Sequence, residues 1–242
     1  LVPLAVDVCP TDYIIEPFQV EKKLSQIDAH KSNGSDDIPN WFLREFSVFL
    51  AEPVCAIFNA SLREGVVPQV WKMANVVPMP KVHPPKNIRT DLRPISLTPT
   101  LSKVLESFIC TWITQHIAEK LDNRQFGCLK GKSTTHELVE LLHRWHEALD
   151  SQLSVRVLFI DYPKAFDHVD HSVVIQKLHK LGVPDILIRW ICSFLLGRQQ
   201  RVKLSDILSD WLTLNGAMPQ GSLLGPLTFI VLISWLFGTQ IR

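Results

Sequence analysis

The sequence predicts a helix-rich α+β fold with a small antiparallel sheet, and three observations support this. Apolar residues recur at helical spacing over long stretches, most clearly between residues 101 and 117. The short run Val155–Asp161 is rich in β-branched and aromatic residues, which is typical of a buried strand. The stretches Arg198–Leu204 and Trp211–Leu214 predict a hairpin around residues 205–210.

The first half of the chain predicts helices followed by a strand. Apolar residues at helical spacing place a short amphipathic helix over Phe18–His30. A second apolar stripe covers Trp41–Leu62, and we expect Pro53 to split it into two helices because proline lacks the backbone N–H. Gly65 should end the second of these. The strand-like stretch Ala74–Lys81 follows.

The second half adds more helices. Thr134 and Glu137 have the spacing of a capping box, which predicts a helix beginning there. A helix over His171–Leu181 should stop at a glycine, and Asp185 should cap the next one. The apolar run Leu223–Phe237 is too short to span a membrane comfortably, so we interpret it as a buried helix and expect no membrane partner.

Composition limits the possible functions. The formal net charge is +1, so nucleic acid would have to bind through local basic patches rather than a global field. The clearest basic patch lies between Lys72 and Lys103. The five cysteines are scattered and include no Cys-x-x-Cys pair, which indicates neither a zinc site nor a disulfide framework. We therefore expect a reducing, intracellular location, in the cytoplasm or the nucleus.

Asp161 is the first candidate for chemistry, because it stands at the open end of the predicted Val155–Asp161 strand. A carboxylate at that place is costly unless a partner or a cation binds it. The alternative from spacing alone is that Asp161 caps a following helix.

Several blocks carry a resemblance to a known family. Phe159–Val169 resembles the first palm motif of reverse transcriptases of non-LTR (LINE-like) retrotransposons, and Gly216–Pro226 resembles their Pro-Gln-Gly motif. The two blocks stand in the family's order, and Arg93–Leu97 is similar to its fingers motif. The resemblance implies a right-hand polymerase fold. We expect an N-terminal extension and loop at residues 1–40, a fingers-like helical region at 41–150 and an incomplete palm at 151–242.

The resemblance also implies an activity, cofactors and partners. The family is an RNA-directed DNA polymerase that uses an RNA template, a DNA primer and deoxynucleotide triphosphates. Two Mg²⁺ ions about 4 Å apart would promote nucleotidyl transfer. The catalytic carboxylate would be Asp161, which would bind metal together with the backbone carbonyl of Tyr162.

By resemblance, further residues would bind the nucleotide. Lys81 and Arg93 would grip the triphosphate, one as a point charge and the other as a fork of donors. Phe166 would lie beneath the sugar, with ordinary core packing as the alternative. Gln220 and Gly221 would lie where the backbone approaches nucleotide and template, and glycine leaves room for that approach. Tyr162 completes the predicted nucleotide-binding set.

The sequence departs from the family where the chemistry would be completed. The family needs a later Ala-Asp-Asp hairpin, and no aspartate follows Gly225. We therefore expect a truncated domain, inactive as a polymerase on its own. The first residue is Leu rather than Met, which favours a fragment or processed product. The alternatives are a non-catalytic RNA-binding module on the same scaffold, or an unstable remnant without function.

Overall fold

The computed structural model describes residues 13–129, 131–162, 165–214 and 216–234. Its α-helices are α1 Pro17–Ser25, α2 Asn40–Glu45, α3 Ser47–Glu64, α4 Ile88–Asp91, α5 Thr100–Ile117, α6 Thr134–Asp150, α7 His171–Lys180, α8 Asp185–Leu195 and α9 Leu224–Ile233. Its strands are β1 Met73–Pro80, β2 Leu92–Leu97, β3 Gln199–Leu204, β4 Ile207–Leu208 and β5 Leu212–Thr213. Short 3-10 turns cover Gln69–Lys72, Ala118–Lys120 and Ala165–His168.

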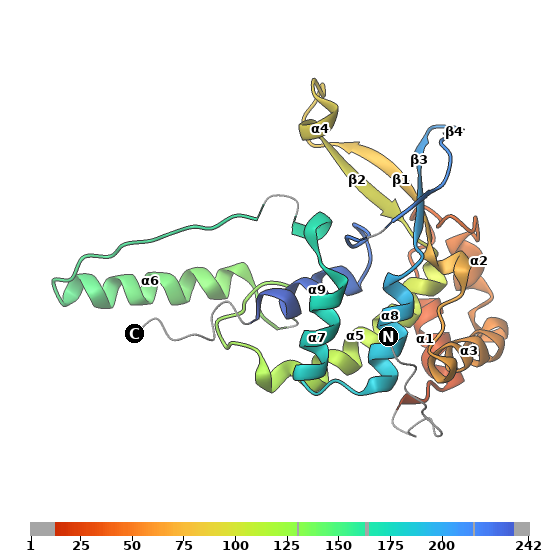
Figure 1. Cartoon of the computed structure of the whole chain (residues 1–242), viewed down its shortest axis with the longest axis horizontal. Coiled ribbons are helices and arrows are strands. Elements are labelled where there is room, and N and C mark those ends of the chain that lie inside the picture. Colours follow the sequence, from red (N-terminus) through yellow and green to blue (C-terminus); the bar gives the residue numbers. More distant parts are fainter. Residues whose placement is uncertain (1–12, 130, 163–164, 215, 235–242) are drawn as a thin grey trace.

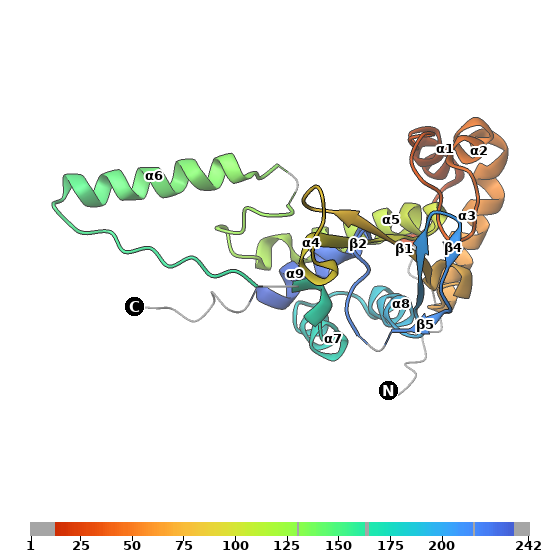
Figure 2. The same ribbon diagram turned by 90° about the horizontal axis from the view of Figure 1, so that it is seen from above.

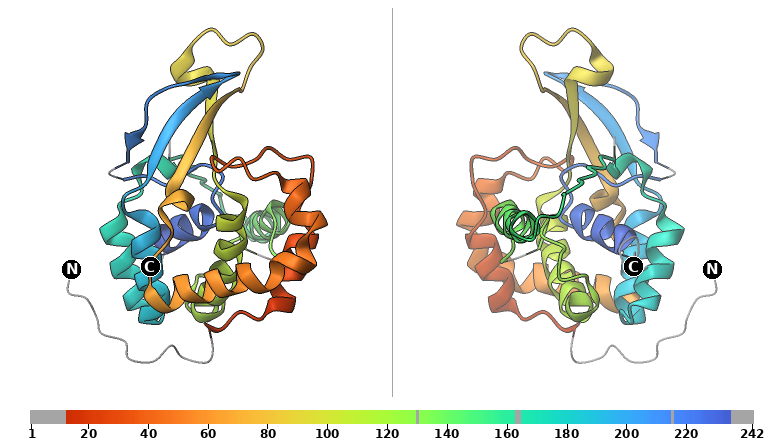
Figure 3. Two further views of the ribbon diagram at one scale, coloured as in Figure 1. Left: turned by 90° about the vertical axis from the view of Figure 1, so that its right-hand side faces the viewer. Right: turned by 90° about the vertical axis from the view of Figure 1, so that its left-hand side faces the viewer.

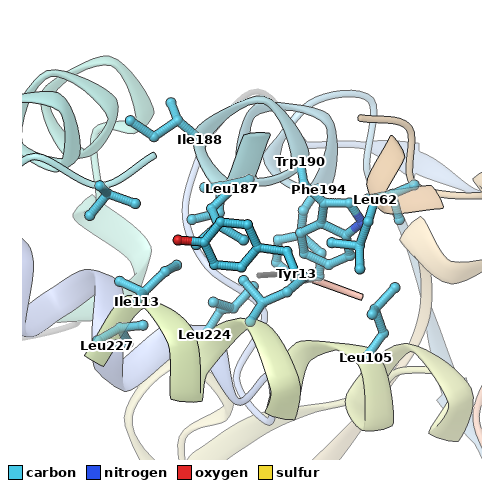
Figure 4. Close-up of a cluster of buried hydrophobic side chains, with 14 of the residues drawn as sticks. Tyr13, Leu62, Leu105, Ile113, Leu187, Ile188, Trp190, Phe194, Leu224 and Leu227 are labelled. Carbon is cyan, nitrogen blue, oxygen red and sulfur yellow. The ribbon is translucent and has the colours of Figure 1, made fainter. Parts of the chain in front are cut away.

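One apolar core joins helices from both halves of the chain (Figure 1). Trp190 and Phe194 stack on α8 with ring centroids 5.5 Å apart, and the indole Nε1 of Trp190 donates to Ser61 Oγ on α3 at 2.9 Å. Helices α5 and α9 also contribute side chains to this core. Figure 4 shows ten of its buried residues: Tyr13, Leu62, Leu105, Ile113, Leu187, Ile188, Trp190, Phe194, Leu224 and Leu227.

A small sheet stands beside the helices, in the order β2-β1-β3-β4, with β5 also paired to β3 (Figure 3). Strand β1 pairs antiparallel with β2 and parallel with β3, so that Asn75 faces both Leu97 and Arg201. The helix-rich α+β class is confirmed. The expectation of a wholly antiparallel sheet is wrong, because a long helical crossover brings β3 beside β1 in parallel. The predicted hairpin after Arg198 is confirmed by the pairing of β3 with β4 and β5.

The predicted buried strand Val155–Asp161 is wrong. Residues 153–162 form an extended segment outside the sheet, and Leu158 and Phe159 are 83% and 81% exposed. A strand is stable only when a neighbouring strand satisfies its backbone groups, and no described strand runs beside this one. Helix α6 precedes it and buries none of its side chains. Figures 1 and 2 show α6 projecting from the body, with the extended segment returning toward it.

Two predicted helix boundaries are also wrong. The break in Trp41–Leu62 falls at Phe46, between α2 and α3, and Pro53 lies inside α3. Pro53 is exposed, so the carbonyl that loses a partner there can face solvent. Helix α6 is capped by Ser133, whose Oγ accepts from His136 N, rather than by a box starting at Thr134.

Other predicted helices are found close to their expected positions. Helix α3 ends at Gly65, which has φ +64°. Helix α8 begins at Asp185 as expected, but the prediction that Asp185 caps it is wrong, because Pro184 is the N-cap and no side chain makes a capping hydrogen bond. Helix α9 is largely buried through Ile233, and residues 235–237 of the predicted span lie outside the described residues. Across the described ranges, no helix is long and apolar enough to cross a membrane.

Candidate functional site

The loop 216–223, which contains the predicted Gln220 and Gly221, docks against β2. Ser96 N donates to Gln220 O at 2.8 Å. Gly221 has φ +121°, a conformation that L side chains rarely adopt, and a Cβ there would lie 2.9 Å from Ser96 O. In the structure, glycine is therefore required by a close approach to the backbone of β2.

Phe166 lies on the other side of the same loop. Its backbone carbonyl accepts from Met218 N at 2.9 Å, and its ring lies 5.9 Å from that of Phe229 on α9. A Cβ at Gly225 would lie 3.3 Å from Cε1 of the Phe166 ring. The ring is half-buried against the edge of the core.

Lys81 and Arg93 lie on the β1–β2 hairpin, and both are exposed. Arg93 pairs with Met79 across the two strands. Lys81 follows β1, its backbone N donating to Asp91 O at 2.7 Å and its Nζ to Thr90 O at 3.1 Å. Arg93 stands three residues before Ser96 on β2, roughly 10 Å along the strand. The hairpin thus places Arg93 on the strand that anchors the 216–223 loop.

Asp161 and Tyr162 are exposed and lie outside this cluster of backbone contacts. The ring of Tyr162 lies 6.4 Å from that of Phe229 on α9, which places the end of the extended segment near the Phe166 side of the loop. A Mg²⁺ ion needs several oxygen ligands in close to octahedral geometry. Within residues 13–129, 131–162, 165–214 and 216–234, no three His, Cys, Asp or Glu side chains could hold a metal ion together.

A buried carboxylate that was not predicted as a site residue anchors the end of the loop. Glu106 on α5 is 0% exposed and accepts hydrogen bonds from Ser222 Oγ at 2.7 Å and from Leu223 N at 2.9 Å. Ser222 Oγ in turn accepts from Leu224 N, the first backbone N–H of α9, at 3.1 Å. The available signal was a glutamate on the apolar stripe of α5, four residues after Ser102, where a charge is costly unless it is paired.

A basic hollow of about 310 Å³ lies between α1, the loop before α2 and the start of α5. Lys23, Lys31 and Lys103 line it, with Asp28 as an opposing charge. Burial is the main cause of the lowered pKa of Lys103. The charge of Lys31 acts in the same direction, whereas the charges of Glu106 and Asp36 oppose it.

Comparison with known proteins gives a consistent result. The sequence profile of the family described as reverse transcriptase (RNA-dependent DNA polymerase) matches residues 80–242. The chain is 32% identical over 222 residues to a probable RNA-directed DNA polymerase from transposon BS of Drosophila melanogaster, covering 90% of this chain and 24% of that protein. It is 27% identical over 240 residues to the RNA-directed DNA polymerase from mobile element jockey of the same species, covering 92% and 26%. The chain thus spans about a quarter of the length of the curated relatives it matches.

Proposed function

Because this chain belongs to the reverse transcriptase family, we propose that it supplies the template- and nucleotide-binding part of a retrotransposon RNA-directed DNA polymerase. The observation that carries this proposal is the docking of Gln220 and Gly221 against the strand that holds Arg93. The family implies an RNA template and nucleotide substrates, and a DNA primer completes the proposed set of partners. The division at residues 1–40, 41–150 and 151–242 stays a prediction.

Each proposed nucleotide-binding residue has a chemical reason. The exposed guanidinium of Arg93 offers paired donors to phosphate oxygens, and the ammonium of Lys81 adds a mobile point charge. The half-buried ring of Phe166 would lie beneath the sugar, where it would exclude a 2′-hydroxyl. Gln220 and Gly221 would place backbone beside the nucleotide and template. Tyr162 joins this set through its position near Phe229.

Catalysis needs more carboxylates than this polypeptide brings together. Reverse transcriptases generally depend on Mg²⁺, and in the proposal Asp161 and the Tyr162 carbonyl are this chain's contribution to metal binding. The sequence has no aspartate or glutamate after Asp210. In the proposal, the remaining carboxylate ligands come from the later Ala-Asp-Asp hairpin that the resemblance implies.

We expect the 242-residue polypeptide to show no primer extension above background on an RNA template in a buffer containing Mg²⁺. Asp161→Asn should then be indistinguishable from the parent chain in the same gel-based assay. Extension that Asp161→Asn abolishes would contradict this expectation, because it would show that a complete catalytic set assembles without the missing segment.

Binding tests the proposal more directly than turnover does. With the chain held on an RNA–DNA primer–template, Arg93→Ala should weaken dTTP binding about tenfold or more, since a hydrogen bond to a charged group contributes about 1.5–3 kcal/mol. Isothermal titration calorimetry measures the change in the dissociation constant of dTTP. Arg44→Ala removes an arginine on α2 that is also exposed, and it serves as the matched control. Equal dTTP affinity in the two variants would refute the role of Arg93.

A second candidate function is RNA binding without chemistry. Two features favour it, namely the exposed cations Lys81, Lys86, Arg89 and Arg93 around the β1–β2 hairpin and the basic hollow beside Lys103. Phosphate contacts make affinity fall steeply with salt. RNA binding that weakens steeply between 50 and 200 mM salt, together with no effect of Arg93→Ala on dTTP binding, would favour this function over the first.

A further inference from the structure

We propose that Glu106 is a positioning residue that holds the 219–223 segment of the loop in place for nucleotide and template. The inference rests on the proposed function, since it names a further residue acting on the same site. Glu106 touches neither the predicted substrate residues nor solvent. It acts through Ser222 and Leu223, which immediately follow Gln220 and Gly221.

The carboxylate of Glu106 is fully engaged. Its Oε2 accepts from Ser222 Oγ and from Leu223 N, and its Oε1 accepts from Ser102 Oγ at 3.0 Å. A buried carboxylate is strongly unfavourable unless hydrogen bonds replace its lost hydration. The loop supplies two of the three bonds. The carboxylate therefore stabilises the docked loop relative to any conformation in which those donors leave.

Glu106 also stabilises the N-terminus of α9. Leu223 is the N-cap of that helix, and its own side chain makes no capping hydrogen bond. The first turn of a helix has unpaired N–H groups and a partial positive charge. The Glu106 carboxylate on α5 accepts the hydrogen bond from Leu223 N and places a negative charge near this end of the helix. The Ser222 hydroxyl accepts a further hydrogen bond from Leu224 N. This couples the docking of the loop to the formation of α9.

A second buried charge lies within electrostatic range of Glu106. Arg198 is 2% exposed, its guanidinium lies 4.4 Å from the Phe194 ring, and its Nη1 donates to Phe194 O at 3.0 Å. Burial lowers the pKa of Arg198 to about 10, and the charge of Glu106 acts in the opposite direction. The hydrogen bonds from Ser102, Ser222 and Leu223 are therefore the contacts that hold the Glu106 carboxylate.

The two anchors of the loop come from adjacent elements. Ser96 on β2 holds Gln220, and Glu106 on α5 holds Ser222 and Leu223. Strand β2 ends at Leu97 and α5 begins at Thr100. One continuous stretch of chain therefore forms hydrogen bonds with the residues on both sides of Gly221. Movement of α5 relative to β2 would thus be transmitted to the residues proposed to meet the nucleotide.

Hydrogen exchange on the full chain tests this without nucleic acid. Glu106→Met removes every acceptor at similar length, and amide exchange across residues 219–224 should become about tenfold faster. Glu106→Gln retains an acceptor oxygen and should restore most of the protection. Should Glu106→Met fail to fold, Ser222→Ala removes one of the two loop bonds from the loop side and should raise exchange in the same segment. Ser107→Ala is the control, because its hydroxyl bonds only within α5, to Val104 O.

Nucleotide binding distinguishes a positioning role from a purely structural one. A purely structural defect should lower dTTP affinity and primer–template affinity together. Ser222→Ala should weaken dTTP binding about fivefold while primer–template affinity stays within about twofold of the parent. Unchanged exchange at 219–224 in Ser222→Ala, or an equal rise in Ser107→Ala, would overturn the proposal. Equal losses of dTTP and primer–template affinity would also overturn it. If the parent chain binds no dTTP, the proposed function fails, and the exchange result still decides the role of Glu106.

Discussion

Replacing Gly221 by alanine is expected to undock the loop from β2 and to weaken dTTP binding about tenfold or more. The added Cβ would lie 2.9 Å from Ser96 O, and it would occupy a backbone conformation at φ +121° that alanine rarely adopts. Such strain costs about 1–3 kcal/mol. Because the clash is with a backbone atom in a paired strand, the loop rather than the sheet should move. Titration of dTTP onto the chain bound to an RNA–DNA primer–template measures the loss.

Gly216→Ala is the matched control for that experiment. Gly216 belongs to the same loop, and a Cβ there would meet no atom within 4 Å. We expect its dTTP affinity to match that of the parent chain within about twofold. If Gly221→Ala binds dTTP as tightly as Gly216→Ala does, the docking of the loop against Ser96 is not required for nucleotide binding.

Replacing Trp190 by alanine is expected to lower the free energy of unfolding by about 3–5 kcal/mol. Trp190 is 0% exposed, stacks on Phe194 and donates its indole N–H to Ser61 Oγ. Its loss would leave a cavity between α3 and α8 and remove one of the two hydrogen bonds of the Ser61 hydroxyl, which also donates to Val66 O. The free energy of unfolding of a domain is only about 5–15 kcal/mol in total. Much of the variant population should therefore unfold at a modest urea concentration. Urea unfolding followed by circular dichroism at 25 °C measures the change.

Trp41→Ala controls for the removal of an indole as such. Trp41 is 55% exposed on α2, so its loss should change stability by less than about 0.5 kcal/mol. Similar unfolding midpoints for the two variants would show that α3 and α8 do not form the stable centre of the chain. A gradual transition for the parent chain would favour the interpretation as an unstable remnant.

Elements defined by local patterns were predicted well. Helix α5 was expected from its apolar stripe, and α3 ends at Gly65 because a left-handed residue is favourable there. Strand β1, at Met73–Pro80, lies within one residue of the predicted Ala74–Lys81 stretch. In each case the deciding interactions join residues that are close in sequence, or in a simple hairpin.

The prediction for Val155–Asp161 failed because strand formation depends on residues that are distant in sequence. Its composition is that of a strand, yet β structure depends on a neighbour, and no described strand pairs with it. Pro53 was misjudged because its cost depends on exposure, which a sequence does not display. The relative placement of Lys81, Arg93, Gln220 and Gly221 likewise came only from the pairing of β1 with β2 and the contact of β2 with the loop.

The sequence by itself determined the family and the strongly periodic helices, because motifs and helical stripes are written in residues a few positions apart. Only the tertiary structure decided that Glu106 meets Ser222, 116 positions later, and that Gly221 lies against Ser96. Those contacts depend on how α5, β2 and α9 pack, and a buried carboxylate is stable there only because the folded chain brings donors to it.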